Sequence, residues 1–325
     1  FVTKSGVRQG CVTGPDLWNF FMQAVLWMYA ARMKETGVQA GVRIASNPDG
    51  IIRARKAQLA SSTVESVVTE VAYADDAAIL AHGIQAAEVA FPTYDEASTG
   101  GGLAVSKQDP TTKIQGKTEV VKIMPGSLEH IQDGRESGVR LGESELPFVQ
   151  CFKYLGSIKS TSKDLGVNQD IEARTRSSFG VMAGLSGMWR SKGLSRTIKG
   201  KMASIYPLGV GLYGDSGWAV TARNMRRLKG WWNKITRWTY GVHVWKFQTF
   251  GKDHDTLRRE MELGDVVTYH RRRVVMQIGH IARKDFMDPS VQLLFGHVKG
   301  RVALGRGRMR HGRGRNLPPH TLLAY

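Results

Sequence analysis

The sequence of 325 residues predicts an α+β fold, with antiparallel strands and flanking helices in the first half and helices in the second. Three observations predict it. Two apolar runs over residues 63–81 flank an Asp-Asp pair, as in a β-hairpin. From about residue 165 onward the apolar spacing becomes helical. The net charge is −3 over residues 1–150 and +21 over residues 151–325, so the helical half is built to contact a polyanion.

The first element is a glycine-punctuated loop over residues 5–11, followed by a helix that starts near Pro15. Six apolar residues of this helix recur at helical spacing, which predicts a face packed into the core. These residues are Leu17, Phe20, Phe21, Ala24, Val25 and Met28. Residues 63–81 then predict two strands joined by a two-residue turn at Asp75 and Asp76.

The elements that follow are shorter. We expect a helix over 84–98, broken near Pro92 because proline removes a helical hydrogen bond. Short strands with Gly and Pro turns are expected over 117–150, and one further strand over 151–159.

The second half is predicted to contain several helices with basic faces. Ser195 can cap one helix, and its inner face would consist of Ile198, Met202 and Ile205. Thr221 can cap the next, with an apolar face made of Met225, Leu228, Trp232, Ile235 and Thr239. The opposite face carries Arg223, Arg226, Arg227, Lys229 and Arg237. A further helix is expected over 264–284.

The composition excludes several classes of protein. Cys11 and Cys151 are the only cysteines, which rules out a disulfide framework and a cysteine-based zinc site. This usage favours an intracellular, reducing compartment, the nucleus or the cytoplasm. The longest uncharged apolar stretch, residues 17–31, is short for a membrane span, so no membrane is expected as a partner. Since the chain begins with Phe1, we expect it to be part of a longer protein.

The Asp-Asp pair is the main candidate for chemistry. Adjacent carboxylates repel each other unless a cation neutralises them, and hard oxygen ligands suit Mg²⁺, with Mn²⁺ as an alternative. On its own, the dipeptide is more often a solvated turn without a function. Residues 209–214 match the pattern G-x-G-x-x-G, but a predicted helix precedes them, so a turn is expected there and not a dinucleotide site.

Three motifs in a fixed order resemble those of reverse transcriptases. The segment Ala72-Tyr73-Ala74-Asp75-Asp76 resembles the YADD motif of that family. Upstream, Gly6-Val7-Arg8-Gln9-Gly10-Cys11 with Pro15 resembles the segment GVRQGC-x-x-x-P. Downstream, Phe152-Lys153-Tyr154-Leu155-Gly156-Ser157-Ile158 resembles the FKYLGS strand. Later phrases such as Leu212-Tyr213-Gly214 extend the resemblance over residues 4–300, to the polymerases of non-LTR (LINE-type) retrotransposons.

This resemblance implies an architecture and an activity. Residues 1–160 would be a partial polymerase palm, 161–245 a helical thumb, 246–300 a basic helical extension and 301–325 a flexible Gly/Arg-rich tail. The activity would be that of an RNA-directed DNA polymerase, a nucleotidyltransferase that uses Mg²⁺ or Mn²⁺. It would add a deoxynucleoside triphosphate (dNTP) to the 3′-hydroxyl of a DNA primer on an RNA template. No haem, flavin or nicotinamide cofactor is implied.

The resemblance also implies roles for individual residues. Asp75 and Asp76 would be catalytic and bind metal, with Asp76 in a supporting role, and Tyr73 would lie under the primer terminus. The template base and incoming nucleotide would lie against Gly6, Gln9 and Gly10, and Arg8 would contact phosphate. The primer grip would consist of Phe152, Lys153, Tyr154, Leu155, Gly156 and Ser157. The basic faces of the thumb would follow the nucleic-acid backbone.

One departure from the family limits this expectation. The family has a further metal-binding aspartate upstream of the Gly6 loop, and this sequence has no residues there, so we expect the chain alone not to polymerise. The alternatives are a non-catalytic basic module that binds RNA or DNA, and a retrotransposon relic. Gly184, Gly187 and Gly200 are expected to weaken their helices by ~1 kcal/mol each relative to alanine.

Overall fold

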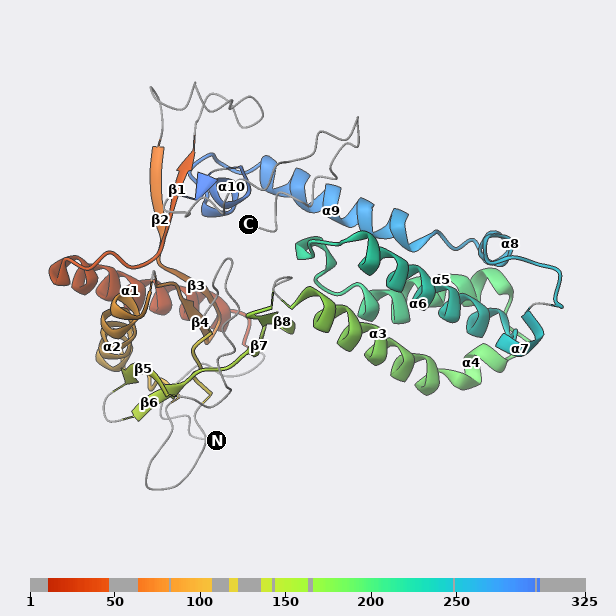
Figure 1. Cartoon of the computed structure of the whole chain (residues 1–325), viewed down its shortest axis with the longest axis horizontal. Coiled ribbons are helices and arrows are strands. Elements are labelled where there is room, and N and C mark those ends of the chain that lie inside the picture. Colours follow the sequence, from red (N-terminus) through yellow and green to blue (C-terminus); the bar gives the residue numbers. More distant parts are fainter. Residues whose placement is uncertain are drawn as a thin grey trace. The chain divides into compact units, whose positions relative to one another are not determined.

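The computed structural model describes residues 11–46, 64–81, 83–106, 117–121, 136–141, 144–162, 166–247, 249–295 and 297–298. These residues form helices and small antiparallel sheets, which agrees with an α+β fold (Figure 1). The chain divides into two compact units. Unit 1 is Phe1–Leu155 with Asp285–Arg308, and unit 2 is Gly156–Lys284 with Met309–Tyr325. The division into palm, thumb, extension and tail stays a prediction.

The described residues of unit 1 form small sheets and three helices. The helices are α1 (Gly14–Thr36), α2 (Ile84–Gly100) and α10 (Pro289–Phe295). One sheet has the order β2-β1-β9, with β1 (Val42–Ser46), β2 (Val64–Val68) and β9 (His297–Val298). Two antiparallel pairs are β3 (Glu70–Tyr73) with β4 (Asp76–Ile79), and β5 (Glu136–Leu141) with β6 (Ser144–Pro147). The remaining described strand of this unit is β7 (Cys151–Tyr154).

The core of unit 1 lies on both sides of α2. Small residues on this helix, among them Ala90 and Ala97, pack against Val25 and Tyr29 of α1. Ala87 packs against buried side chains of β5 and β6. The expected break near Pro92 is wrong, because α2 runs through this residue without interruption. A proline costs one hydrogen bond in a helix, and here packing on both sides holds the helix together.

The predicted inward face of α1 is wrong in part. Val25 is fully buried, whereas Leu17 and Phe20 are 58% and 78% exposed. The helix has apolar residues around much of its surface, and its buried side is formed by Met22, Val25, Tyr29 and Met33. Apolar spacing alone did not show which side α2 would cover. Among the described residues, no helix is long and apolar enough to cross a membrane.

Unit 2 consists of helices around one apolar core. Its elements are β8 (Ser157–Ser160), α3 (Val167–Gly184), α4 (Ser186–Arg190), α5 (Arg196–Gly211), the 3₁₀ turn η1 (Asp215–Gly217), α6 (Ala222–Tyr240), α7 (Val244–Phe247), α8 (His254–Glu260) and α9 (Val266–Ala282). Two predicted helix caps are confirmed. The hydroxyl oxygens of Ser195 and Thr221 accept hydrogen bonds from the backbone N–H groups of Ile198 and Asn224, each at 3.2 Å.

The predicted inner face of α5 is wrong in part, because of its three residues only Met202 packs against the core. Ile198 and Ile205 are exposed, and the buried positions include Gly200, Ala203 and Gly211. A Cβ atom added to Gly211 would lie 2.2 Å from the indole of Trp231, so the glycine permits close packing. The predicted turn is correct in part, because residues 209–211 of the G-x-G-x-x-G pattern end α5 and only residues 212–214 form a turn.

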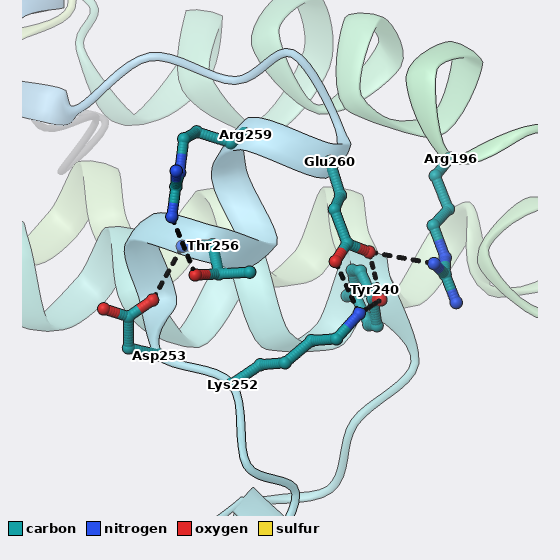
Figure 2. Close-up of polar contacts among 7 residues, drawn as sticks. All are labelled: Arg196, Tyr240, Lys252, Asp253, Thr256, Arg259 and Glu260. Atoms are coloured by element: carbon teal, nitrogen blue, oxygen red, sulfur yellow. Dashed lines mark hydrogen bonds and ion pairs between the residues drawn. The ribbon is translucent and has the colours of Figure 1, made fainter.

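A polar cluster connects α5, α6 and α8 in unit 2 (Figure 2). The carboxylate of Glu260 accepts hydrogen bonds from the Tyr240 hydroxyl at 2.5 Å, from the Arg196 guanidinium at 2.9 Å and from the Lys252 ammonium group. The Arg196 guanidinium also lies 4.3 Å from the centre of the Tyr240 ring. The hydrogen bonds from Lys252 and Tyr240 lower the pKa of Glu260 below its usual value of 4.5.

This cluster predicts an acid-sensitive contribution to stability. Because the folded-state pKa of Glu260 is lowered, its contribution is present above pH 4.5 and is lost as the pH falls below that value. In the parent chain the free energy of unfolding should fall between about pH 6 and about pH 3, and we expect this fall to be smaller in Glu260→Gln. Urea unfolding at each pH measures it. Glu172→Gln, at an exposed position of α3, is the control and should follow the parent chain. Equal pH dependence in all three proteins would contradict the prediction.

Candidate functional site

The Asp-Asp pair lies on the hairpin of β3 and β4. Tyr73 pairs with Asp76, so the two-residue turn consists of Ala74 and Asp75. The turn therefore comes one residue earlier than predicted, and Asp76 begins β4. Directly paired residues project from the same face of a hairpin, which places Asp76 beside Tyr73.

The sequence before this hairpin also differs from the prediction. The single strand expected up to Tyr73 is interrupted at Thr69. Its first part, β2, pairs with β1, and its second part, β3, pairs with β4. The apolar run was continuous in sequence, and only pairing with different partners divides it.

The hairpin presents its carboxylates to solvent. Asp75 and Asp76 are exposed, and the Tyr73 side chain is 66% exposed. Among the described residues, no group of three or more His, Cys, Asp or Glu side chains is placed to hold a metal ion. Mg²⁺ is commonly held by one or two carboxylates and completes its shell with water and substrate phosphates, so these two side chains suit its chemistry.

The FKYLGS segment is a second hairpin, not the single strand that the sequence predicted. Its strands are β7 and β8, with Leu155 and Gly156 in the turn between them. Both turn residues have positive φ, 47° and 81°, as a type I′ turn requires. The glycine at the second turn position is a sequence signal that could have predicted this turn.

Both turns contain a residue in a strained backbone conformation. Among the described residues, only three that are not glycine have positive φ: Ala74, Leu155 and Glu262. Two of the three occupy the turns of the two motifs. Left-handed backbone costs such residues about 1–2 kcal/mol, and such strain is concentrated at functional sites.

A hydrogen bond brings the two motifs together within unit 1. The Tyr154 hydroxyl of β7 donates to the carbonyl oxygen of Val71 in β3 at 3.0 Å. Burial raises the pKa of Tyr154, and the nearby negative charge of Asp76 raises it further. Residues 83 positions apart in sequence are therefore in contact, and a predicted primer-grip residue lies close to a predicted catalytic carboxylate.

The other predicted site residues fall into two groups. Gly6, Arg8, Gln9 and Gly10 lie outside the described residues. On β7, Phe152 is half-buried with its ring centre 6.4 Å from that of Tyr154, and Lys153 is exposed. In unit 2, Gly156 lies against Arg174 and Tyr213, which were not predicted as site residues, and Ser157 lies close to Gly214. Arg174 pairs with Asp170, four residues earlier on α3, and this spacing was the available signal.

The exposed face of α6 carries several basic side chains. Residues 156–284 contain 24 basic and 9 acidic side chains, a net charge of +15. The predicted basic positions on α6 lie outside its buried face. Arg227 pairs with Glu172 at 3.5 Å, whereas Arg223 and Arg226 are exposed and form no ion pair with the described carboxylates. Such a face suits the phosphates of a nucleic acid.

The strain at Ala74 predicts opposite effects for two substitutions in the same hairpin. We expect Ala74→Gly to stabilise unit 1 by about 0.5–1 kcal/mol, because glycine adopts positive φ without the steric cost of a Cβ atom. We expect Ala77→Gly, in β4, to destabilise it by a similar amount, because glycine weakens a regular strand. Denaturant unfolding followed by circular dichroism measures both. Destabilisation by both variants would contradict the assignment of strain to Ala74.

Comparisons with known proteins do not identify the family of this chain. No protein-family model, no curated protein and no solved structure matches it. Membership of the reverse transcriptases therefore stays a prediction from the motifs.

Proposed function

We propose that this chain is part of an RNA-directed DNA polymerase of the non-LTR retrotransposon type. It would contribute the metal-binding hairpin, the primer grip and a basic helical region. The observation that carries the proposal is the hydrogen bond from Tyr154 to the Val71 carbonyl, which joins the hairpin of Asp75 and Asp76 to β7. A nucleotidyl-transfer site needs these two parts close together, because the primer terminus must lie beside the metal-binding carboxylates.

In the proposed reaction the primer 3′-oxygen forms a bond to the α-phosphorus of the dNTP. The bond from that phosphorus to the pyrophosphate oxygen breaks, and the hydroxyl proton passes to water. A divalent metal ion would favour loss of this proton and neutralise charge on the phosphates. Asp75 and Asp76 would hold the ion, and the exposed Tyr73 ring would support the primer end. The residues of β7 and of the Leu155–Gly156 turn would orient that end.

Primer extension on an RNA template, with Mg²⁺ or Mn²⁺, tests the proposal. It is run on the 325-residue chain and on any longer product of the same gene. We expect Asp75→Asn to abolish synthesis in whichever form is active and to leave duplex binding unchanged. Glu35→Gln, an equally exposed carboxylate of unit 1, is the matched control. Synthesis by Asp75→Asn at the parent rate would overturn the assignment of Asp75 to the metal.

A second candidate function is a non-catalytic module that binds RNA or DNA. The net charge of +15 on residues 156–284 and the exposed basic face of α6 favour it. Both functions predict binding that weakens steeply with salt, so salt dependence does not separate them. Binding without synthesis in every form tested would favour the module.

A further inference from the structure

Gly156, the second residue of the FKYLGS turn, begins unit 2, where α3 and the loop after α5 pack around it. We call Asp170, Arg174, Tyr213 and Gly214 the turn seat. The Arg174 guanidinium donates a hydrogen bond to the carbonyl oxygen of Gly156. The same guanidinium lies over the Tyr213 ring, 4.3 Å from its centre. Arginine can stack and donate hydrogen bonds at once because its guanidinium is planar.

The seat fits closely around Gly156 and Ser157. A Cβ atom added to Gly156 would lie 3.0 Å from the Arg174 guanidinium and 3.4 Å from the Tyr213 ring. A Cβ atom on Gly214, which has a φ of 72°, would lie 2.9 Å from the Ser157 hydroxyl oxygen. Both glycines have positive φ, 81° and 72°, which a residue with a Cβ atom adopts only with strain, and both leave little room for such an atom.

Asp170 supports the seat from within the core. Its side chain is 2% exposed, and Oδ2 accepts a hydrogen bond from the Trp218 indole N–H at 2.8 Å. Oδ1 accepts one from the backbone N–H of Ile158 at 3.3 Å and lies 3.6 Å from Nε of Arg174. One buried carboxylate thus holds both the strand that leaves the turn and the arginine that contacts it. Buried charges with several partners have a fixed geometry, because every lost contact is costly.

We infer that Arg174 is a positioning residue for the primer terminus. It acts through Gly156, a residue of the proposed primer grip, whose carbonyl oxygen it holds by a hydrogen bond. This inference rests on the proposed function, since it assigns a role within that site. The basic face of α6 would bind the nucleic-acid backbone, whereas Arg174 would determine where the last nucleotide of the primer lies. Its substitution should therefore affect the rate of addition more than the affinity for the duplex.

The test compares Arg174→Ala with Arg176→Ala, which removes an exposed arginine from the same helix. Each protein is assayed below its own unfolding temperature, so that loss of folding does not contribute. We expect Arg174→Ala to lower the single-turnover rate of nucleotide addition by about 10- to 100-fold. The dissociation constant of the primer–template should change less than about twofold, and Arg176→Ala should match the parent in both. Arg174→Lys keeps the charge and loses the stacking, so it should restore the rate only in part.

A second measurement does not depend on synthesis. A primer with 2-aminopurine as its last base reports, by fluorescence, the stacking of that base in the complex without dNTP. We expect the signal with Arg174→Ala to differ from those with the parent and with Arg176→Ala. If the parent and every longer form fail to extend a primer, the proposed function fails, and this signal still decides whether Arg174 positions the primer end. Equal signals for Arg174→Ala and Arg176→Ala would overturn the inference.

Discussion

Replacing Gly200 with alanine should destabilise unit 2 by about 2 kcal/mol. An added Cβ atom at this position of α5 would lie 2.0 Å from the carbonyl oxygen of Met261 and 2.9 Å from its carbonyl carbon. Both are backbone atoms at the end of α8, so α5 and α8 would have to move apart. Overpacking of a core costs up to about 3 kcal/mol. The higher helix propensity of alanine offsets about 1 kcal/mol of this, which leaves a net loss of about 2 kcal/mol.

Gly209 provides the matched control, because it lies in the same helix with no atom within 4 Å of its added Cβ. Gly209→Ala should stabilise unit 2 by about 0.5–1 kcal/mol, from helix propensity alone. Urea unfolding followed by tryptophan fluorescence measures both, since six of the eight tryptophans lie in residues 156–284. If the Gly200→Ala variant is as stable as the Gly209→Ala variant, then α5 and α8 do not approach each other as closely as described.

Gly200 also shows where prediction from sequence ends. In sequence it is a helix-weakening residue, and the expected gain from alanine was ~1 kcal/mol. From the structure we expect alanine to destabilise unit 2 instead, because the carbonyl oxygen of Met261, 61 residues away in sequence, occupies the space that the Cβ atom needs. The caps at Ser195 and Thr221 could be predicted because the acceptor and donor are three residues apart. Packing between distant segments leaves no such local signal.

The same distinction applies to helix faces. Spacing predicted correctly that Leu228, Trp232 and Ile235 of α6 are buried. It failed for Ile198 and Ile205 of α5, which are exposed, while the buried positions include the small residues Gly200, Ala203 and Gly211. A prediction that assigns the largest apolar side chains to the core cannot identify such a face.

The sequence predicted the separate segments of the candidate site but not how they lie relative to one another within unit 1. The hairpin with Asp75 and the segment with Tyr154 could each be found from their own residues. Their contact, from the Tyr154 hydroxyl to the Val71 carbonyl, depends on the fold of unit 1 as a whole. The positive φ angles of Ala74 and Leu155 were also not predicted, because neither alanine nor leucine favours the left-handed region. Two-residue hairpin turns commonly require positive φ, and here alanine and leucine occupy such positions.

The second large effect is expected at Asp170, the buried carboxylate of the turn seat. Asp170→Ala should destabilise unit 2 by about 3–5 kcal/mol, the usual result of removing one partner from a buried ionic group. The buried indole N–H of Trp218 and the backbone N–H of Ile158 would lose their acceptor, and Arg174 would lose its carboxylate. Asp170→Asn keeps the shape and one acceptor oxygen, so its effect should be smaller.

Glu172→Ala is the control, because Glu172 lies on the same helix and its ion pairs with Arg176 and Arg227 are exposed. It should change the free energy of unfolding by less than about 1 kcal/mol. A double-mutant cycle between Asp170 and Arg174 then separates general destabilisation from the function of the seat. The separation of 3.6 Å indicates that the two side chains act together. The destabilisation of the double variant should then be smaller than the sum of the two single effects, by at least about 1 kcal/mol. Strict additivity would mean that Asp170 supports the core through Trp218 and Ile158 alone, and that Arg174 holds the turn without its help.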